Sequence, residues 1–316
     1  MAKKNAGIVK KKAPLSQRIA KELRHNWILY LMILPVLIYY IIFSYTPMYG
    51  ITIAFKDYKV KQGILGSAWV GLKHFKRFFG VYNFTNLLKN TLTLSIYSLL
   101  VGFPIPIIFA LILNYSTKPV LKKVTQMISY APHFISTVVV CGMLQLFLDK
   151  NTGVFNSVRA LFGLEGISFL SNEHMFKHIY VWSGVWQGMG WSAIIYISSL
   201  AGVDYELHEA AIIDGASKIQ RMRYIDIPSI TPTIVMLLIL QLGGLMSVGF
   251  EKAYLLQNSL NSPASSIIST YVYEQGLTNA SYDYSTAVGL FNTVVNVILL
   301  VSSNTFSKKV LNESLF

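Results

Sequence analysis

The sequence predicts an all-α membrane protein with six transmembrane helices, on the strength of composition and of repeated apolar segments. Of the 316 residues, 53% are hydrophobic and only 13% are charged, whereas soluble globular domains carry about 25% charged residues. The mean hydropathy is positive, at +0.49. Six segments approach the ~20 apolar residues that a helix needs to cross the bilayer core. These segments are Trp27–Thr46, Thr91–Asn114, Val124–Leu148, His178–Leu200, Ser229–Phe250 and Ser285–Thr305.

The first apolar segment follows a basic stretch from Lys3 to Arg24, an arrangement that it shares with signal peptides. Its apolar run is longer than a signal peptide requires, and no small-residue cleavage site follows it. We therefore expect a membrane-spanning helix there. The predicted domains are a basic cytoplasmic tail over residues 1–26 and a transmembrane domain over residues 27–316.

Proline and glycine mark two of the later segments. Pro104 and Pro106 predict a bend in the second segment, because neighbouring helices can satisfy the carbonyl groups that a proline leaves free. Gly184 and Gly188 lie one turn apart in the fourth segment, a spacing typical of close helix packing in membranes. The single cysteine, Cys141, falls inside an apolar segment and is expected to be a small buried residue.

The distribution of Lys and Arg predicts that both ends of the chain are cytoplasmic. Basic residues collect in the N-terminal tail, in the loops around 118–123 and 218–223, and at Lys308 and Lys309. Positive charge near the ends of spans marks the cytoplasmic side, which also explains the net charge of +13 without a nucleic-acid partner. The first loop is basic too, but it is roughly 45 residues long and orienting power falls away from helix ends.

The loop between the fourth and fifth segments carries strong helix signals. Asp204 is a good N-cap for a helix over Tyr205–Ile213, and Gly215 suits the left-handed turn that ends a helix. Ser217 and Gln220 fit a capping box that begins a second short helix. Pro228 is then expected to break this helix before the fifth segment. The prediction is a cytoplasmic module of two short helices over about residues 204–228.

Residues 209–228 read EAAIIDGASKIQRMRYIDIP, and their spacing resembles the EAA loop of permease subunits in type I ABC importers. The resemblance implies the fold of these permeases, with cytoplasmic coupling helices. It also implies that this helix lies in a cleft of a separate ATPase and moves when ATP closes the ATPase dimer. Carried over by motif position, the coupling residues are Glu209, Ala210, Ala211, Gly215, Ile225 and Pro228.

Four further stretches extend the resemblance over most of the chain. They are Tyr130–Ser136 (YAPHFIS), Gly190-Trp191, Gly249-Phe250-Glu251 and Thr270–Tyr273 (TYVY), and they are similar to carbohydrate permeases that import complex oligosaccharides in Gram-positive bacteria. That family implies a bacterial plasma-membrane assembly of two permease subunits, two ATPase subunits and an extracellular lipid-anchored binding protein. The particular glycan does not follow from the resemblance.

The sequence offers no chemistry of its own. It contains no G-x-x-x-x-G-K-[ST] phosphate loop, no G-x-S-x-G nucleophile motif and no H-E-x-x-H zinc helix, and its six histidines are scattered. The chain is therefore predicted to be a pore-forming subunit rather than an enzyme, with no cofactor or metal of its own. ATP and Mg²⁺ belong to the partner ATPase.

Polar and aromatic residues within the apolar segments are candidates for the sugar path, because such groups are costly in the bilayer unless they face a cavity or another helix. Apolar sugar faces stack on aromatic rings, and amides bind hydroxyl groups. A role in the interfacial belt, in packing or in bonds between helices explains the same residues equally simply. The candidates are Trp186, Gln187, Trp191, Gln241, Asn292, Asn296 and His133.

Two alternatives to sugar import stay open. An ABC permease for peptides, amino acids or an anion would keep the coupling loop, but anion transport favours basic residues in the core of the spans, and the six segments show none there. An ion-coupled secondary transporter or a channel would need no ATPase. It would be expected to show intramembrane carboxylates or an inverted repeat, and the sequence shows neither.

Overall fold

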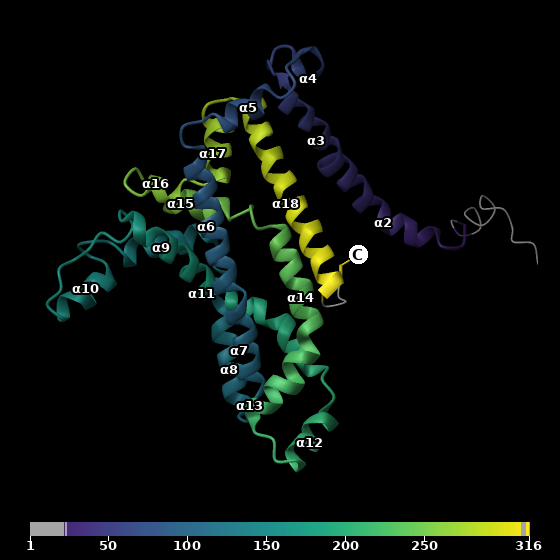
Figure 1. Ribbon diagram of the computed structural model, residues 1–316, viewed down its shortest axis with the longest axis vertical. Coiled ribbons are helices and arrows are strands. Elements are labelled where there is room, and N and C mark those ends of the chain that lie inside the picture. The colour runs from purple at the N-terminus through teal and green to yellow at the C-terminus, as the bar shows by residue number, and fades with distance from the viewer. Residues whose placement is uncertain (1–21, 23, 311–313, 316) are drawn as a thin grey trace, which may run out of the picture.

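A computed structural model describes residues 22, 24–310, 314 and 315, so most of the predicted basic tail lies outside the described residues. The described chain is almost entirely helical, as predicted. Its one described sheet is a short antiparallel pair, β1 (Lys56–Asp57) and β2 (Ala68–Trp69). Figure 1 shows an elongated bundle, with α4 (Gly63–Gly66) and α5 (Lys73–Phe79) at one end and α12 (Tyr205–Ile213) at the other.

Four described helical stretches are long and apolar enough to cross a membrane. They contain the first, second, fifth and sixth predicted segments, except that the fifth helix ends before Phe250. The fourth predicted segment lies within the 29-residue helix α11 (Glu173–Ala201), which is longer than a span requires but more polar. The four stretches are Trp27–Phe55, Phe84–Asn114, Lys218–Gly243 and Tyr282–Val310.

The first stretch stands apart from the bundle. None of the residues of α2 (Trp27–Tyr40) is buried, and Figure 1 shows this helix diverging from α18 (Tyr282–Val310). Only its far end, the 3-10 helix η2 (Tyr49–Phe55), packs against α18. The apolar surface of α2 is therefore not covered by the described part of this chain. Between α2 and η2 lie η1 (Ile41–Tyr45) and α3 (Thr46–Met48).

The third predicted segment, Val124–Leu148, is not one straight helix. It is broken into α8 (Pro119–Tyr130), the 3-10 turn η3 (Ala131–Phe134) and α9 (Thr137–Phe147), with a bend of 98°. Pro132 lies inside the turn and cannot donate a backbone hydrogen bond, and Ser136 caps α9 by accepting one from Val139 N–H at 3.3 Å. The sequence predicted an apolar segment of this length, but it did not predict the break within the segment.

The fifth predicted segment is too long, because α14 (Ile227–Gly243) ends at a pair of glycines, Gly243 and Gly244. The second stretch is divided at Phe103, directly before Pro104, at the prolines that were expected to bend it. Its two parts are α6 (Phe84–Gly102) and α7 (Pro104–Asn114). The remaining elements are short helices between the spans. They are α10 (Val154–Leu161), α15 (Phe250–Leu256), α16 (Ser262–Ser265), α17 (Ile268–Tyr273) and η5 (Glu274–Thr278).

The helix α11 is central to the bundle, because it packs against α6, α7, α8, α14, α15 and α16. Two of the three apolar clusters are built on it. One joins α11 to α6, α9 and α15 around Phe176 and Val181, and another joins it to α7 and α14 around Ala193 and Ile230. The third cluster lies around Phe78 and joins α5, α6, α17 and α18. The first two clusters therefore fix two sections of α11, and the third fixes the end of the bundle at α5.

Close packing of α11 depends on Gly190 rather than on the predicted pair Gly184 and Gly188. A Cβ atom at Gly190 would lie 2.2 Å from the carbonyl oxygen of Ser129 in α8, nearer than any real contact. At Gly188 a Cβ atom would meet nothing within 4 Å, and at Gly184 it would meet only the tip of Lys252, at 3.4 Å. The small-residue spacing therefore does not mark a helix contact here.

Gly190→Ala should destabilise the protein, because α11 or α8 must shift to admit the methyl group. Overpacking of this kind costs about 1–3 kcal/mol. The measurement is the melting temperature of the purified complex in detergent, with Gly188→Ala as the matched control. We expect a lower melting temperature for Gly190→Ala alone; equal melting temperatures for the two variants would contradict the close contact.

Candidate functional site

The predicted two-helix module forms at one end of the bundle. The side chain of Asp204 accepts a hydrogen bond from Glu206 N–H at 3.0 Å and begins α12, as expected of an N-cap. Gly215 then takes a positive φ of 80°, where a side chain would be strained. Ser217 and Gln220 form the predicted capping box, with reciprocal bonds of 3.3 and 2.8 Å, and begin α13 (Lys218–Arg221).

Pro228 does not end the second helix, and this part of the prediction was wrong. From Lys218 the chain continues through the π-helical turn η4 (Met222–Asp226) directly into α14, and the whole is one stretch to Gly243. Pro228 lies in the first turn of α14, where its missing N–H is tolerated because the wider π turn has already displaced the hydrogen-bond register. The module is therefore joined to the fifth span without a hinge.

A fully buried carboxylate, that of Asp226, attaches the module to the bundle. Its Oδ2 accepts a hydrogen bond of 2.6 Å from the hydroxyl group of Tyr115, the residue directly after α7. Its Oδ1 lies 3.2 Å from Nε2 of His208 in α12, an ion-pair distance without hydrogen-bond geometry. Three segments of the chain thus meet at one side chain. We call Tyr115, His208 and Asp226 the Asp226 clamp.

The Tyr115 hydroxyl is held in its protonated, donating form. Burial raises the pKa of Tyr115 above its ordinary value, and the hydrogen bond to Asp226 raises the pKa further by a smaller amount. The guanidinium group of Arg221 lies 5.6 Å from the centre of the Tyr115 ring and opposes this rise in pKa. A raised pKa favours the protonated hydroxyl at every pH below about 10, so the contact persists at neutral pH.

Sequence reasoning missed all three residues of the Asp226 clamp. One signal was present: Asp226 is an acidic residue between Ile225 and Ile227, directly before an apolar span. A carboxylate at such a position is expensive unless a partner compensates it. Its partners were not predictable, because Tyr115 lies 111 positions away along the chain.

The predicted coupling residues lie on the surface of the module. Glu209, Ala210, Gly215 and Pro228 are exposed, whereas Ala211 and Ile225 are half-buried. Large apolar side chains are exposed beside them, and that of Ile213 is 85% accessible. An exposed apolar surface that also carries carboxylates, here those of Glu206 and Glu209, is typical of a protein docking site. The other exposed large apolar residues of the module are Tyr205, Leu207, Ile212, Ile219, Tyr224 and Ile227.

A separate cavity of about 370 Å³ lies between α6, α11, α15 and the end of α14. This volume falls in the range of about 300–1,000 Å³ that small-molecule sites occupy. Its lining combines small apolar groups with hydroxyls and amides, and Gly184 and Gly188 provide room on the α11 side. We call it the central cavity; its polar lining residues are Ser95, Ser98, Tyr180, Gln187, Ser192, Gln241, Ser247 and Lys252.

The structure brings Gln187 and Gln241 together at the central cavity but places the candidate tryptophans elsewhere. The side chain of Gln187 also donates a 2.9 Å hydrogen bond to the Ile135 carbonyl at the break before α9. Trp186 lines an apolar groove against α9, and Trp191 lines a neighbouring cavity that Gln241 shares. Neither tryptophan lines the central cavity.

The other candidates for the sugar path also lie away from the central cavity. His133 stacks on the Trp191 ring with centroids 4.4 Å apart. Asn296 accepts a hydrogen bond from Met246 N–H and donates one to Ser247 Oγ, each of 2.8 Å, which ties α18 to the turn after α14. Asn292 lines a pocket next to α17, and its Oδ1 is buried without a hydrogen-bond partner. Their role in a sugar path remains a prediction.

Lys252 is a cavity residue that sequence reasoning missed, because it lies in α15, outside the predicted spans. It is only 8% exposed, and its Nζ lies 5.2 Å from the centre of the Tyr180 ring. Burial lowers the pKa of the Lys252 ammonium group to about 8, so the group remains largely charged at neutral pH. A positive charge therefore lies at the central cavity.

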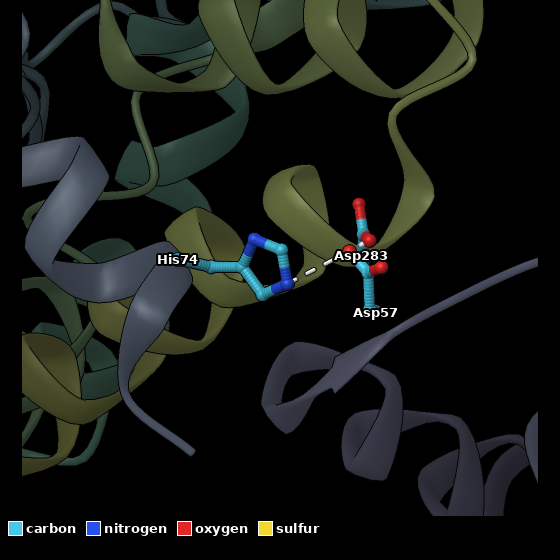
Figure 2. Close-up of side chains that lie close together, drawn as sticks. All are labelled: Asp57, His74 and Asp283. Carbon is cyan, nitrogen blue, oxygen red and sulfur yellow. Dashed lines mark ion pairs between the residues drawn. The ribbon is translucent and has the colours of Figure 1, made fainter. Parts of the chain in front are cut away.

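Three side chains with metal-binding groups meet at the end of the bundle opposite α12 (Figure 2). The ligand atoms of Asp57, His74 and Asp283 lie within 4.8 Å of one another. Protein groups already contact all three: His74 Nε2 donates to the Lys56 carbonyl at 2.9 Å, Asp57 faces Lys73 Nζ at 3.5 Å, and Asp283 Oδ2 accepts a hydrogen bond from Tyr58 N–H at 3.1 Å. Because His74 also lies 3.6 Å from Asp283, the cluster ties the first loop to α18.

Comparison with known proteins places this architecture in one family. Residues 102–312 match the model of the family described as "Binding-protein-dependent transport system inner membrane component". The chain is 45% identical to protein LplB of Bacillus subtilis strain 168 over 293 residues, 93% of this chain and 92% of that protein. It is 43% identical to the polygalacturonan/rhamnogalacturonan transport system permease protein YteP of the same organism, over 98% of this chain and 96% of that protein.

Solved structures agree with the sequence comparison. A crystal structure of a bacterial ABC transporter involved in the import of the acidic polysaccharide alginate matches with a TM-score of 0.87 and 39% identity, over 93% of this chain and 99% of that chain. The alginate transporter in complex with an alginate pentasaccharide-bound periplasmic protein matches equally well, at 38% identity. The chain belongs to the family of binding-protein-dependent transport system inner membrane components, and is a multi-pass membrane permease subunit of an ABC transporter.

Proposed function

We propose that this subunit imports complex oligosaccharides by alternating access and that the module over residues 204–228 couples it to a separate ATPase. The observation that carries the proposal is the Asp226 clamp, which joins an exposed docking surface to two helices of the bundle. The proposed assembly contains a second permease subunit, two ATPase subunits that bind ATP and Mg²⁺, and an extracellular lipid-anchored binding protein. This chain would hold no cofactor of its own.

The surface of α12 supports contact with an ATPase. Glu209 is exposed and offers one carboxylate to an Arg or Lys of a partner, and the small side chain of Ala210 lets a groove approach the helix backbone. Burial of apolar side chains such as Ile213 would contribute to the affinity. These are the features that the coupling role requires.

The connections of the module support a mechanical role. Movement of α13 would pass into α14 along a continuous helix, because no loop separates them. Movement of α12 would pass through His208 and Asp226 to the same helix, and through Tyr115 to the end of α7. Both α7 and α14 pack on α11, which lines the central cavity. A push on the module would therefore reach the cavity wall through rigid contacts.

The central cavity supports passage of a sugar. Hydroxyl and amide groups line it, and two of the predicted path residues, Gln187 and Gln241, are among them. The names of YteP and of the alginate transporter record polysaccharide substrates, and one solved complex includes a sugar-bound periplasmic protein. We extend this substrate class, and the binding protein, to the present chain. The path residues Trp186, Trp191, Asn292, Asn296 and His133 would act only at other stages of transport.

The proposal includes six spans with both termini in the cytoplasm. It places α12 and α13 on the cytoplasmic side with the basic residues Lys218, Arg221 and Arg223, and places α5 and the Asp57–His74–Asp283 cluster outside. The broken segment α8–α9 and the polar helix α11 would supply the third and fourth crossings.

Glu209→Ala and Gly215→Pro should uncouple ATP hydrolysis from transport. Loss of a desolvated charge pair costs about 2–5 kcal/mol, and proline cannot adopt the φ of 80° that ends α12. We expect sugar uptake by the reconstituted complex to fall about tenfold or more. The control is Glu173→Ala, an exposed glutamate at the other end of α11. Wild-type sugar-stimulated ATPase activity and uptake in both module variants would exclude the coupling role.

Tyr115→Phe should weaken coupling without altering the docking surface. It removes one hydrogen bond to a buried carboxylate, which contributes about 1.5–3 kcal/mol. The matched control is Tyr205→Phe, since the Tyr205 ring is exposed on α12. We expect Tyr115→Phe to lower the amount of sugar transported per ATP hydrolysed while ATPase subunits still co-purify. An unchanged ratio of sugar transported to ATP hydrolysed would show that the Asp226 clamp does not transmit movement from the module to the bundle.

A further inference from the structure

The ammonium group of Lys252 is buried without a hydrogen-bond acceptor. Its residue is 92% buried, and Nζ has no hydrogen-bond partner among the described residues. No described carboxylate lies within 4.0 Å of it. The one favourable contact is with the face of the Tyr180 ring, 5.2 Å away. Three N–H donors are thus left for another molecule.

A lysine in this state is expensive to keep for the fold alone. Removing an ammonium group from water costs several kcal/mol unless an acceptor or an opposite charge replaces the water. A cation–π contact such as that with Tyr180 returns only about 0.5–2 kcal/mol. Packing does not require the charge either, since a methionine side chain fills a similar volume. The positive charge of Lys252 is therefore explained best by a ligand that enters the cavity.

The surroundings of Nζ leave space and no competing negative charge. A Cβ atom added at Gly184 would lie 3.4 Å from Nζ, at van der Waals contact, so Nζ faces the part of α11 that carries this glycine. Ser98 is also at the central cavity, and its Oγ is buried without a partner. Among the described lining residues there is no Asp or Glu, so Lys252 sets the sign of the charge in the cavity.

We propose that Lys252 binds the carboxylate of a uronic-acid residue as an acidic oligosaccharide passes through the central cavity, an inference that rests on the proposed import of oligosaccharides. A neutral sugar would offer only hydroxyl oxygens, which do not compensate a desolvated positive charge. A carboxylate offers both the opposite charge and the acceptors, and charge-assisted hydrogen bonds are about twice as strong as neutral ones. The serine and glutamine side chains of the same cavity would bind the sugar hydroxyls.

The test compares two sugars that differ only in charge. Trigalacturonate carries carboxylates where α-1,4-galactotriose carries hydroxymethyl groups. Uptake of each is measured in proteoliposomes that contain the complete importer and its binding protein, with wild-type, Lys252→Gln and Lys252→Arg subunits. Because the binding protein is the same throughout, its own selectivity cancels between variants. We expect Lys252→Gln to lower trigalacturonate uptake about tenfold or more, Lys252→Arg to keep most of it, and neither to lower galactotriose uptake.

Thermal stability separates recognition from a structural role. Because Lys252 has no hydrogen-bond partner to lose, and the desolvation cost of its charge exceeds the cation–π contact with Tyr180, Lys252→Gln should melt at the wild-type temperature or above it. A lower melting temperature, or equal losses of both sugars, would contradict the assignment. A wild-type importer that transports galactotriose and no uronate would overturn it while leaving the proposed function intact. An importer whose ATPase responds to no sugar at all would instead contradict the proposed function.

Discussion

The buried carboxylate of Asp226 is the interaction on which this account of coupling depends. Among the described residues it is the one Asp or Glu that is fully buried, and an unpaired charge there would cost several kcal/mol. Its partners, Tyr115 after α7 and His208 in α12, therefore fix the module against two helices rather than one. The same electrostatic constraint that stabilises this end of the bundle makes the module a rigid part of it. A docking surface attached by flexible loops would absorb movement instead of passing it on.

Asp226 and Lys252 are both buried, but their surroundings differ. Protein groups contact both carboxylate oxygens of Asp226 at the module, the Tyr115 hydroxyl through a hydrogen bond and His208 Nε2 at 3.2 Å. Lys252 is compensated only by the Tyr180 ring, and its place is at the central cavity, where a ligand is expected. A charge held by protein partners rigidifies the site around it, whereas a charge without an acceptor remains available for binding. Between them lies α11, which packs on both α7 and α14 and lines the cavity.

Local chemistry made much of the fold predictable. The caps at Asp204, Ser217 and Gln220 and the left-handed turn at Gly215 follow from residues within a few positions of one another, and α12 has the predicted bounds. Features that depend on distant partners were missed or mistaken: the 98° break at Pro132, the continuity through Pro228, and the clamp between Tyr115 and Asp226. Lys252 was missed for a different reason, because only residues within apolar segments were considered as cavity residues. Burial of a charge by tertiary packing leaves little trace in local sequence.

If the Asp226 clamp is rigid, the module moves as one body with the ends of α7 and α14. Spin labels at Glu206→Cys in α12 and Ile112→Cys in α7, in a Cys141→Ala background, report the distance between these helices by double electron–electron resonance. In the assembled importer, we expect the same narrow distance distribution with and without trapped ATP, and a broader one when Asp226→Asn is added. A distance that changes on ATP binding in the otherwise intact clamp would show that α12 swings independently, and would exclude a rigid clamp.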